Sequence, residues 1–119
     1  MIGRFFKSLN YLFAGILLFT LMGCEPDRPL APPDYIRGHK VYYGYCSGCH
    51  ESGNKKVPNL REKRFFPDKT SDSRMLKSIR DGRGKMPPQG GMLQAEDLKE
   101  VIRYIRYLQR NDQKTEKGK

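Results

Sequence analysis

The segment Cys46-Ser47-Gly48-Cys49-His50 constrains this chain more than any other feature, because it brings two thiols and an imidazole into one short stretch. In a protein outside the cytosol, Cys-x-x-Cys-His is the spacing of a covalent haem attachment site. The two thiols lie one helical turn apart, so each can add to one vinyl group of haem, and the imidazole is then held under the iron as the proximal ligand. The motif therefore predicts that Cys46, Cys49 and His50 bind haem. The alternative is a redox-active or zinc-binding cysteine pair.

The N-terminus is predicted to be a targeting segment that takes no part in the fold. Arg4 and Lys7 precede an apolar run over residues 11–22. Leu21-Met22-Gly23-Cys24 then resembles a bacterial lipobox, in which the cysteine is lipidated and the chain is cut just before it. We therefore expect a lipoprotein signal peptide over residues 1–23 and a lipid on Cys24.

Two alternatives to the lipoprotein remain open: an uncleaved membrane anchor and a soluble secreted protein. The apolar run is short for a membrane span, which needs about 20 apolar residues. All three possibilities place the rest of the chain outside the cytoplasm. The lipoprotein hypothesis locates it on the periplasmic side of the bacterial cell envelope, anchored to the membrane through Cys24.

Size and cysteine content agree with a small haem domain. Removing residues 1–23 leaves 96 of the 119 residues, which is enough for one domain with a marginal core. A covalent haem would supply much of the missing apolar surface, so we expect the haem-free chain to be poorly folded. The three cysteines divide into two for haem and one for lipid, which leaves none for a disulfide.

The charge suggests acidic partners. The formal charge of +10 includes Arg4 and Lys7, so the mature chain keeps +8, or about +6 with two haem propionates. A basic surface can attract nucleic acid, anionic lipid or acidic proteins. Nucleic acid is not expected outside the cytoplasm, which leaves acidic proteins and anionic lipid head groups.

The mature chain divides into three parts. Residues 24–33 hold four prolines and predict an extended, Pro-rich tether. Residues 34–110 carry all the helical patterns, and residues 111–119 form a polar, charged tail that we expect to fray.

Three helices are predicted, with no strand after the signal segment, so the fold class is all-α. The first covers about 34–46, with Asp34 as its N-cap. The second covers about 71–81, capped by Ser71 and stopped by Gly82. The third covers about 95–110. Their apolar faces follow three- and four-residue spacing; the expected members are Tyr35, Gly38, Val41, Tyr42 and Tyr45, then Met75, Leu76 and Ile79, then Leu98, Val101, Ile102, Ile105 and Leu108.

From about Asp34 to Arg110 the chain resembles the small monohaem class I c-type cytochromes. In that family a glycine and an aromatic residue precede the first haem cysteine by eight and four positions, where Gly38 and Tyr42 stand here. An aromatic residue of the last helix usually packs at the helix crossing that the glycine allows, and Tyr104 matches it. The resemblance implies a fold of three to five helices around one covalently bound haem c.

The resemblance also implies further haem contacts on both faces. Pro58-Asn59-Leu60 matches a family segment in which the proline carbonyl accepts the hydrogen bond of the proximal histidine, and Leu60 would pack on the haem. Gly84-Lys85-Met86-Pro87-Pro88 matches the turn that supplies the distal ligand, which makes Met86 the second iron ligand beside His50. Met75 and Met92 are the rival methionines, and His39 lies too near Cys46 to reach the distal face.

A His/Met haem has no open iron position and suits one-electron transfer rather than catalysis. The expected function is a membrane-tethered periplasmic electron carrier, not an enzyme. Its partners would be acidic redox proteins: a quinol-oxidising complex or dehydrogenase as donor, and a terminal oxidase or reductase as acceptor. A basic ring of Lys55, Lys56, Arg83 and Lys85 would steer them, unless these are only solubilising charges. The alternatives are a fixed electron-entry subunit of a larger complex, a haem enzyme such as a peroxidase, and a haem-based gas sensor.

Overall fold

The computed structural model describes residues 29–118, so the predicted signal peptide and the lipidation of Cys24 lie outside the described residues. Short helical segments come first, and two longer helices follow. The elements in chain order are η1 (Pro33–Tyr35), α2 (Ile36–Val41), η2 (Tyr42–Cys46), α3 (Ser47–His50), η3 (Lys63–Phe65), α4 (Asp72–Asp81) and α5 (Ala95–Lys117). The described residues form no strand, only one isolated bridge between Arg83 and Met86.

Helical backbone runs without a break from Pro33 to His50, so the first predicted helix is present and longer than expected. Asp34 does not cap it, because the helical segment begins one residue earlier, at Pro33, with no side-chain cap. Proline suits that position, since it has no N–H to satisfy and its φ is already helical. The segment η2 is π-helical, so its backbone hydrogen bonds span one more residue than those of an α-helix.

The π-helical turn explains an error in the predicted buried face. An α-helix would place Tyr45 on the face of Val41, but Tyr45 is 52% exposed. Because the π turn takes up an extra residue, Cys46 occupies the buried position instead. The turn therefore directs the first thiol of the haem motif toward the core.

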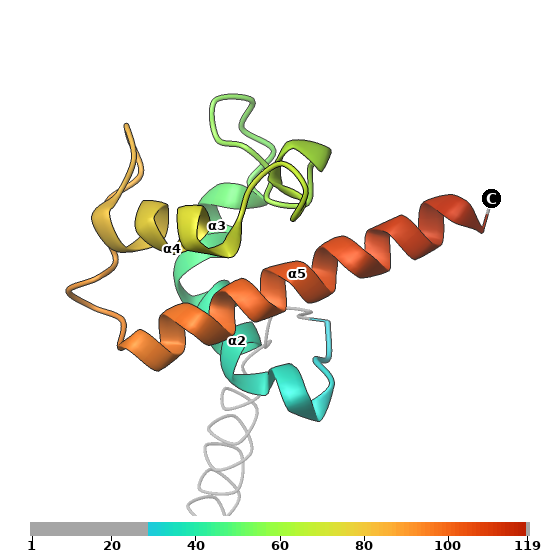
Figure 1. Ribbon diagram of the computed structural model, residues 1–119, viewed down its shortest axis with the longest axis horizontal. Helices are drawn as coiled ribbons and strands as arrows, with labels where there is room; N and C mark the ends of the chain where they lie inside the picture. The colour runs from blue at the N-terminus through green and yellow to red at the C-terminus, as the bar shows by residue number, and fades with distance from the viewer. Residues whose placement is uncertain (1–28, 119) are drawn as a thin grey trace, which may run out of the picture.

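The longest helix, α5, crosses α2 at the centre of the molecule, and α4 lies alongside α5 (Figure 1). Gly38 makes the crossing possible, because the Glu100 backbone and Tyr104 Cβ occupy the space a side chain would need. Tyr42 and Tyr104 are almost fully buried there, with ring centroids 5.5 Å apart. The crossing implied by the family resemblance is present.

The second and third helices begin where the sequence predicts. Ser71 caps α4 by accepting a hydrogen bond from the Arg74 N–H, and Gly82 follows the helix with φ +78°. A capping box between Gln94 and Asp97 starts α5. Its end is not where the apolar pattern stops: α5 continues to Lys117 and its last turns extend beyond the helices it packs on (Figure 1). The frayed tail predicted after Arg110 is thus helical as far as Lys117.

The described part of the Pro-rich segment contacts the domain. His39 Nε2 donates a hydrogen bond to the Pro29 carbonyl over 2.8 Å, and Tyr35 N–H donates to the Pro32 carbonyl. Ala31 packs against the core. The part of the predicted tether from Pro29 onward is therefore docked rather than free. Across residues 29–118, none of the helices has the length and apolarity to cross a bilayer.

Candidate haem-binding site

The histidine of the haem motif is held by a proline carbonyl. His50 Nδ1 lies 2.7 Å from the Pro58 carbonyl oxygen, the contact that the family resemblance implies. A carbonyl can only accept, so Nδ1 carries the proton and donates it. In the neutral imidazole Nε2 is then the nitrogen without a proton, with its lone pair available to a metal.

The two cysteines of the motif are free thiols in different environments. Cys46 is buried and Cys49 is exposed, at positions three residues apart on the helical segment. Burial, and then the charge of Cys49, raises the pKa of Cys46 to about 11, so this thiol stays protonated at neutral pH. Two unpaired thiols followed by an imidazole with a free Nε2 fit a haem bound through two thioethers and one axial nitrogen.

Leu60 lies in a tight turn just after Pro58 and is half-buried against the core. The Asn59 N–H donates to Glu62 Oε1, and Asn59 Oδ1 accepts from the Arg61 N–H, so side chains close the turn from outside. A half-buried leucine next to the histidine's acceptor could pack on a haem face.

Met86, the second candidate iron ligand, lies in a loop that is anchored to α4 at both ends. Met86 and Arg83 exchange backbone hydrogen bonds of 3.0 and 3.1 Å around Gly84, whose φ of +60° suits the turn. An added Cβ at Gly82 would meet the Met86 carbonyl at 2.7 Å, so only glycine allows this approach. The Gln89 N–H then returns to the Ile79 carbonyl of α4. The thioether of Met86 is thereby carried on a well-defined loop.

The three described methionines of the mature chain differ in burial. Met86 is half-buried and packs against the core. Met75 belongs to the core of α4, where its thioether is enclosed by protein, and Met92 is 63% exposed. Met86 is thus the methionine that is neither enclosed in the core nor largely in solvent.

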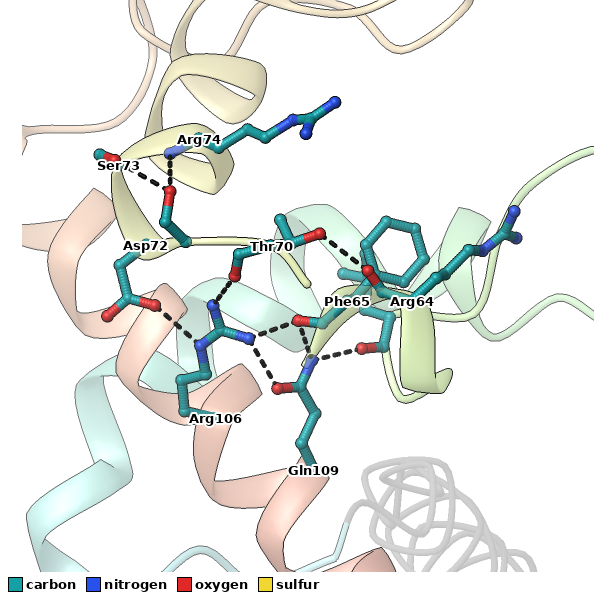
Figure 2. Close-up of polar contacts among 10 residues, drawn as sticks. Arg64, Phe65, Thr70, Asp72, Ser73, Arg74, Arg106 and Gln109 are labelled. Atoms are coloured by element: carbon teal, nitrogen blue, oxygen red, sulfur yellow. Dashed lines mark hydrogen bonds and ion pairs between the residues drawn. The ribbon is translucent and has the colours of Figure 1, made fainter. Parts of the chain in front are cut away.

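A buried polar network, which the sequence prediction missed, holds the loop between His50 and α4 (Figure 2). Arg106 of α5 donates to the Asp72 carboxylate over 2.8 Å and to the backbone carbonyls of Phe65 and Thr70. Gln109 donates from Nε2 to the Leu60 carbonyl over 2.7 Å and to Phe65 over 3.2 Å. Their signal was present: they lie four and seven residues after Ile102, on the apolar face of α5.

A second network borders the haem motif. Tyr42 donates its hydroxyl proton to Glu51 over 2.9 Å, and Arg61 donates to the same carboxylate oxygen over 3.1 Å. Burial, then the hydrogen bond and charge of Glu51, raise the pKa of Tyr42 far above its ordinary value of 10. Glu51, the residue after His50, is therefore hydrogen-bonded to a tyrosine at the crossing of α2 and α5.

A helical domain with this attachment motif, a proline-held imidazole and a glycine-mediated helix crossing defines a class of protein, the small monohaem class I c-type cytochromes. Comparison with known proteins agrees. The family model described as "Cytochrome C oxidase, cbb3-type, subunit III" matches residues 33–105, and the chain belongs to this family.

Relatives and a solved structure support the same class. The chain is 33% identical over 61 residues to cytochrome c-551 of Halorhodospira halophila, covering 50% of this chain and 78% of that one. It is 28% identical over 78 residues to cytochrome c6 of Gracilaria tenuistipitata var. liui, covering 60% and 70%. The crystal structure of cytochrome c6C from Synechococcus sp. PCC 7002 has a similar fold, with a TM-score of 0.52 at 24% identity over 63% of this chain and 96% of that chain.

These findings confirm several predictions. The chain is an all-α small cytochrome c fold, and it carries a single covalent haem c. It is an electron carrier and not an enzyme. The zinc-site and redox-pair alternatives for the two cysteines are set aside accordingly.

Proposed function

We propose that the protein is a membrane-tethered periplasmic electron carrier whose haem iron is ligated by His50 and Met86. The observation that carries this proposal is the 2.7 Å hydrogen bond from His50 Nδ1 to Pro58, which leaves Nε2 free to bind iron. A haem with histidine and methionine ligands supplies a one-electron couple without an open coordination position. The protein's part is to hold both ligands still, so that little reorganisation accompanies the change of charge.

The loop around Met86 supports its assignment as the distal ligand. Backbone hydrogen bonds to Arg83 fix the turn, and Gly82 lets the segment lie against the end of α4. A pre-organised loop holds a thioether at less entropic cost than a mobile one.

An extracytoplasmic location and a lipid on Cys24 are supported by the sequence of the N-terminus. Positive charge, an apolar run and a small residue before Cys24 follow the order of a lipoprotein signal. Haem attachment through Cys-x-x-Cys-His also belongs to proteins outside the cytosol. We propose that Cys24 anchors the protein to a membrane of the bacterial cell envelope.

Partners are proposed to dock through the four cations Lys55, Lys56, Arg83 and Lys85, named here the basic ring. All four side chains are exposed. None of them has a carboxylate within ion-pair distance among residues 29–118, whereas Arg37, Lys77 and Arg103 are paired. Unpaired cations leave a net positive field, which attracts an acidic docking surface. An acidic quinol-oxidising complex or dehydrogenase would be the donor, and a terminal oxidase or reductase the acceptor.

The second candidate function is a fixed electron-entry subunit of a larger respiratory or dehydrogenase complex. The family description, which names subunit III of a cbb3-type oxidase, favours it. In a fixed subunit, electrons would move inside one assembly, so encounter rates would not limit transfer.

Stopped-flow reduction of the physiological partner across a salt series separates the two functions. Exposed charges are screened beyond a Debye length of about 8 Å at physiological salt. We expect a rate that falls steeply with salt for a diffusing carrier, and a flat series would favour the fixed subunit. Arg83→Glu with Lys85→Glu should slow transfer at low salt. The matched control, Lys114→Glu with Lys117→Glu, makes the same charge change at the end of α5 and should have a smaller effect.

A further inference from the structure

Gln109 is a polar side chain placed in the core, where only a complete set of hydrogen bonds makes it tolerable. It is 1% exposed. Its amide oxygen accepts from Arg106 over 2.8 Å, and its amide nitrogen donates to the carbonyls of Leu60 and Phe65. The amide thus uses both of its donors and its acceptor.

Arg106 fixes which way this amide points. A guanidinium can only donate, so the Gln109 atom facing it must be the oxygen, and the NH₂ group must face the Leu60 carbonyl. Arg106 is itself 6% exposed and held by the Asp72 carboxylate and two backbone carbonyls, as Figure 2 shows. The orientation of the Gln109 donor is therefore set by neighbouring protein groups.

The Leu60 carbonyl is two residues from Pro58, whose carbonyl accepts from His50. The other hydrogen bonds of this turn involve Asn59, Arg61 and Glu62 at the exposed surface, where water competes for them. The bond from Gln109 comes from the core instead. It is the contact best able to hold the turn, and with it the Pro58 acceptor, in place.

We propose that Gln109 is a positioning residue for the proximal histidine: its hydrogen bond to Leu60 fixes the 58–60 turn so that the Pro58 carbonyl stays aligned with His50 Nδ1. This inference rests on the proposed ligation of iron by His50. The Nδ1–H bond makes the imidazole a stronger electron donor to a metal. Loosening the turn should weaken that bond, favour ferrous iron and raise the reduction potential.

The test compares three variants of the full haem-loaded protein. Gln109→Leu removes the donor, and Gln109→Glu keeps an acceptor for Arg106 while losing the donor at neutral pH. Asp72→Asn is the matched control, because it weakens the same network without touching Leu60. The measurements are the reduction potential, the exchange rate of the His50 Nδ1 proton by NMR, and the free energy of unfolding in urea.

We expect both position-109 variants to speed exchange of the His50 Nδ1 proton tenfold or more relative to wild type at the same pH. The potential should rise in Gln109→Leu, which removes the donor without adding a charge. Asp72→Asn should lower the free energy of unfolding while leaving exchange and potential near wild type. Acidification of Gln109→Glu protonates the new carboxyl, whose O–H can again donate to Leu60. Exchange relative to wild type should then slow to within about twofold.

If Gln109→Leu does not fold, the pH response of Gln109→Glu decides alone. Position-109 variants that lose stability but keep the wild-type exchange rate and potential would overturn the inference and leave a purely structural role. A wild-type ferric protein in which the His50 ring shows no paramagnetic shift would overturn the proposed ligation itself, and the inference with it. The two failures are thus distinguishable.

Discussion

Gly38 lies so close to Glu100 that a Cβ atom added to it would overlap the Glu100 carbonyl oxygen. The same atom would be 2.8 Å from the Cβ of Tyr104. Both neighbours are fixed parts of α5 and cannot swing aside. The helix crossing therefore depends on the absence of a side chain at one position of α2.

Gly38→Ala should separate the two helices and lower the free energy of unfolding by about 3 kcal/mol, as overpacking of a close contact does. Gly44, on the same helical segment, is the matched control, because an added Cβ there meets nothing within 4 Å. Gly44→Ala should raise stability by about 0.5–1 kcal/mol, the helix-propensity difference. Urea unfolding of the two variants checks both values, and equal effects would contradict the role of the crossing.

Met86→Ala should abolish the weak red absorption band of the ferric protein that reports iron–sulfur ligation, and should lower the reduction potential because the thioether favours ferrous iron. Met92→Ala and Met75→Leu are the controls, and both should keep the band. Loss of the band in either control, with its retention in Met86→Ala, would assign the distal ligand elsewhere.

Tyr42 should make the protein sensitive to alkali. Its pKa is raised in the fold, chiefly by burial, so the folded state keeps a proton that the unfolded chain releases above its ordinary pKa of 10. The contribution of Tyr42 to stability is then complete below pH 10 and falls by about 1.4 kcal/mol per pH unit above it. Tyr42→Phe should therefore make the decline of stability with pH shallower by about 1.4 kcal/mol per pH unit. It should also lower the free energy of unfolding at neutral pH by about 1 kcal/mol, because the hydrogen bond to Glu51 is lost.

Urea unfolding between pH 8 and about 11.5 measures these slopes. Tyr45→Phe is the matched control, because it removes the same hydroxyl group from a residue that is 52% exposed. A Tyr42→Phe slope equal to that of wild type would show that another group governs the alkaline decline.

Cys24→Ser should abolish lipidation and leave the haem unaffected, because Cys46 and Cys49 form the attachment motif without it. Cell fractionation should find the variant released or with its signal segment retained, and the absorption spectrum of the haem should match wild type. A Cys24→Ser protein without haem would refute the assignment of one cysteine to lipid and two to haem.

The fold was predictable where local signals are strong. Ser71, Gly82 and the apolar spacing of α5 located two helices, because caps and periodicity act within a few residues. The end of α5 was not predictable from apolar spacing, since residues 111–117 are polar and yet helical; they place Lys114 and Lys117 in the last turn, where the helix dipole favours them.

The haem-binding motifs were predictable from the sequence, but the contacts that hold the haem-binding loop in place were not. The contact of His50 with Pro58 follows from the family resemblance, and the structure contains it. The positions of Arg106 and Gln109 on the apolar face of α5 mark them as buried polar residues, but their partners could not be predicted, because these are backbone carbonyls 36 to 49 residues away. The π-helical turn that buries Cys46 is likewise absent from residue spacing, which assumes one helical period throughout.

The hydrogen bond between His39 and Pro29 shortens the distance from the membrane over which the protein can search for partners. If Cys24 carries the lipid, only residues 25–28 separate it from the docked Pro29. The chain between them spans at most about 18 Å, which is less than the width of a small domain. Such a cytochrome would move laterally with its lipid and stay at nearly constant height above the bilayer. A partner could then accept its electron only through a docking surface at that same height.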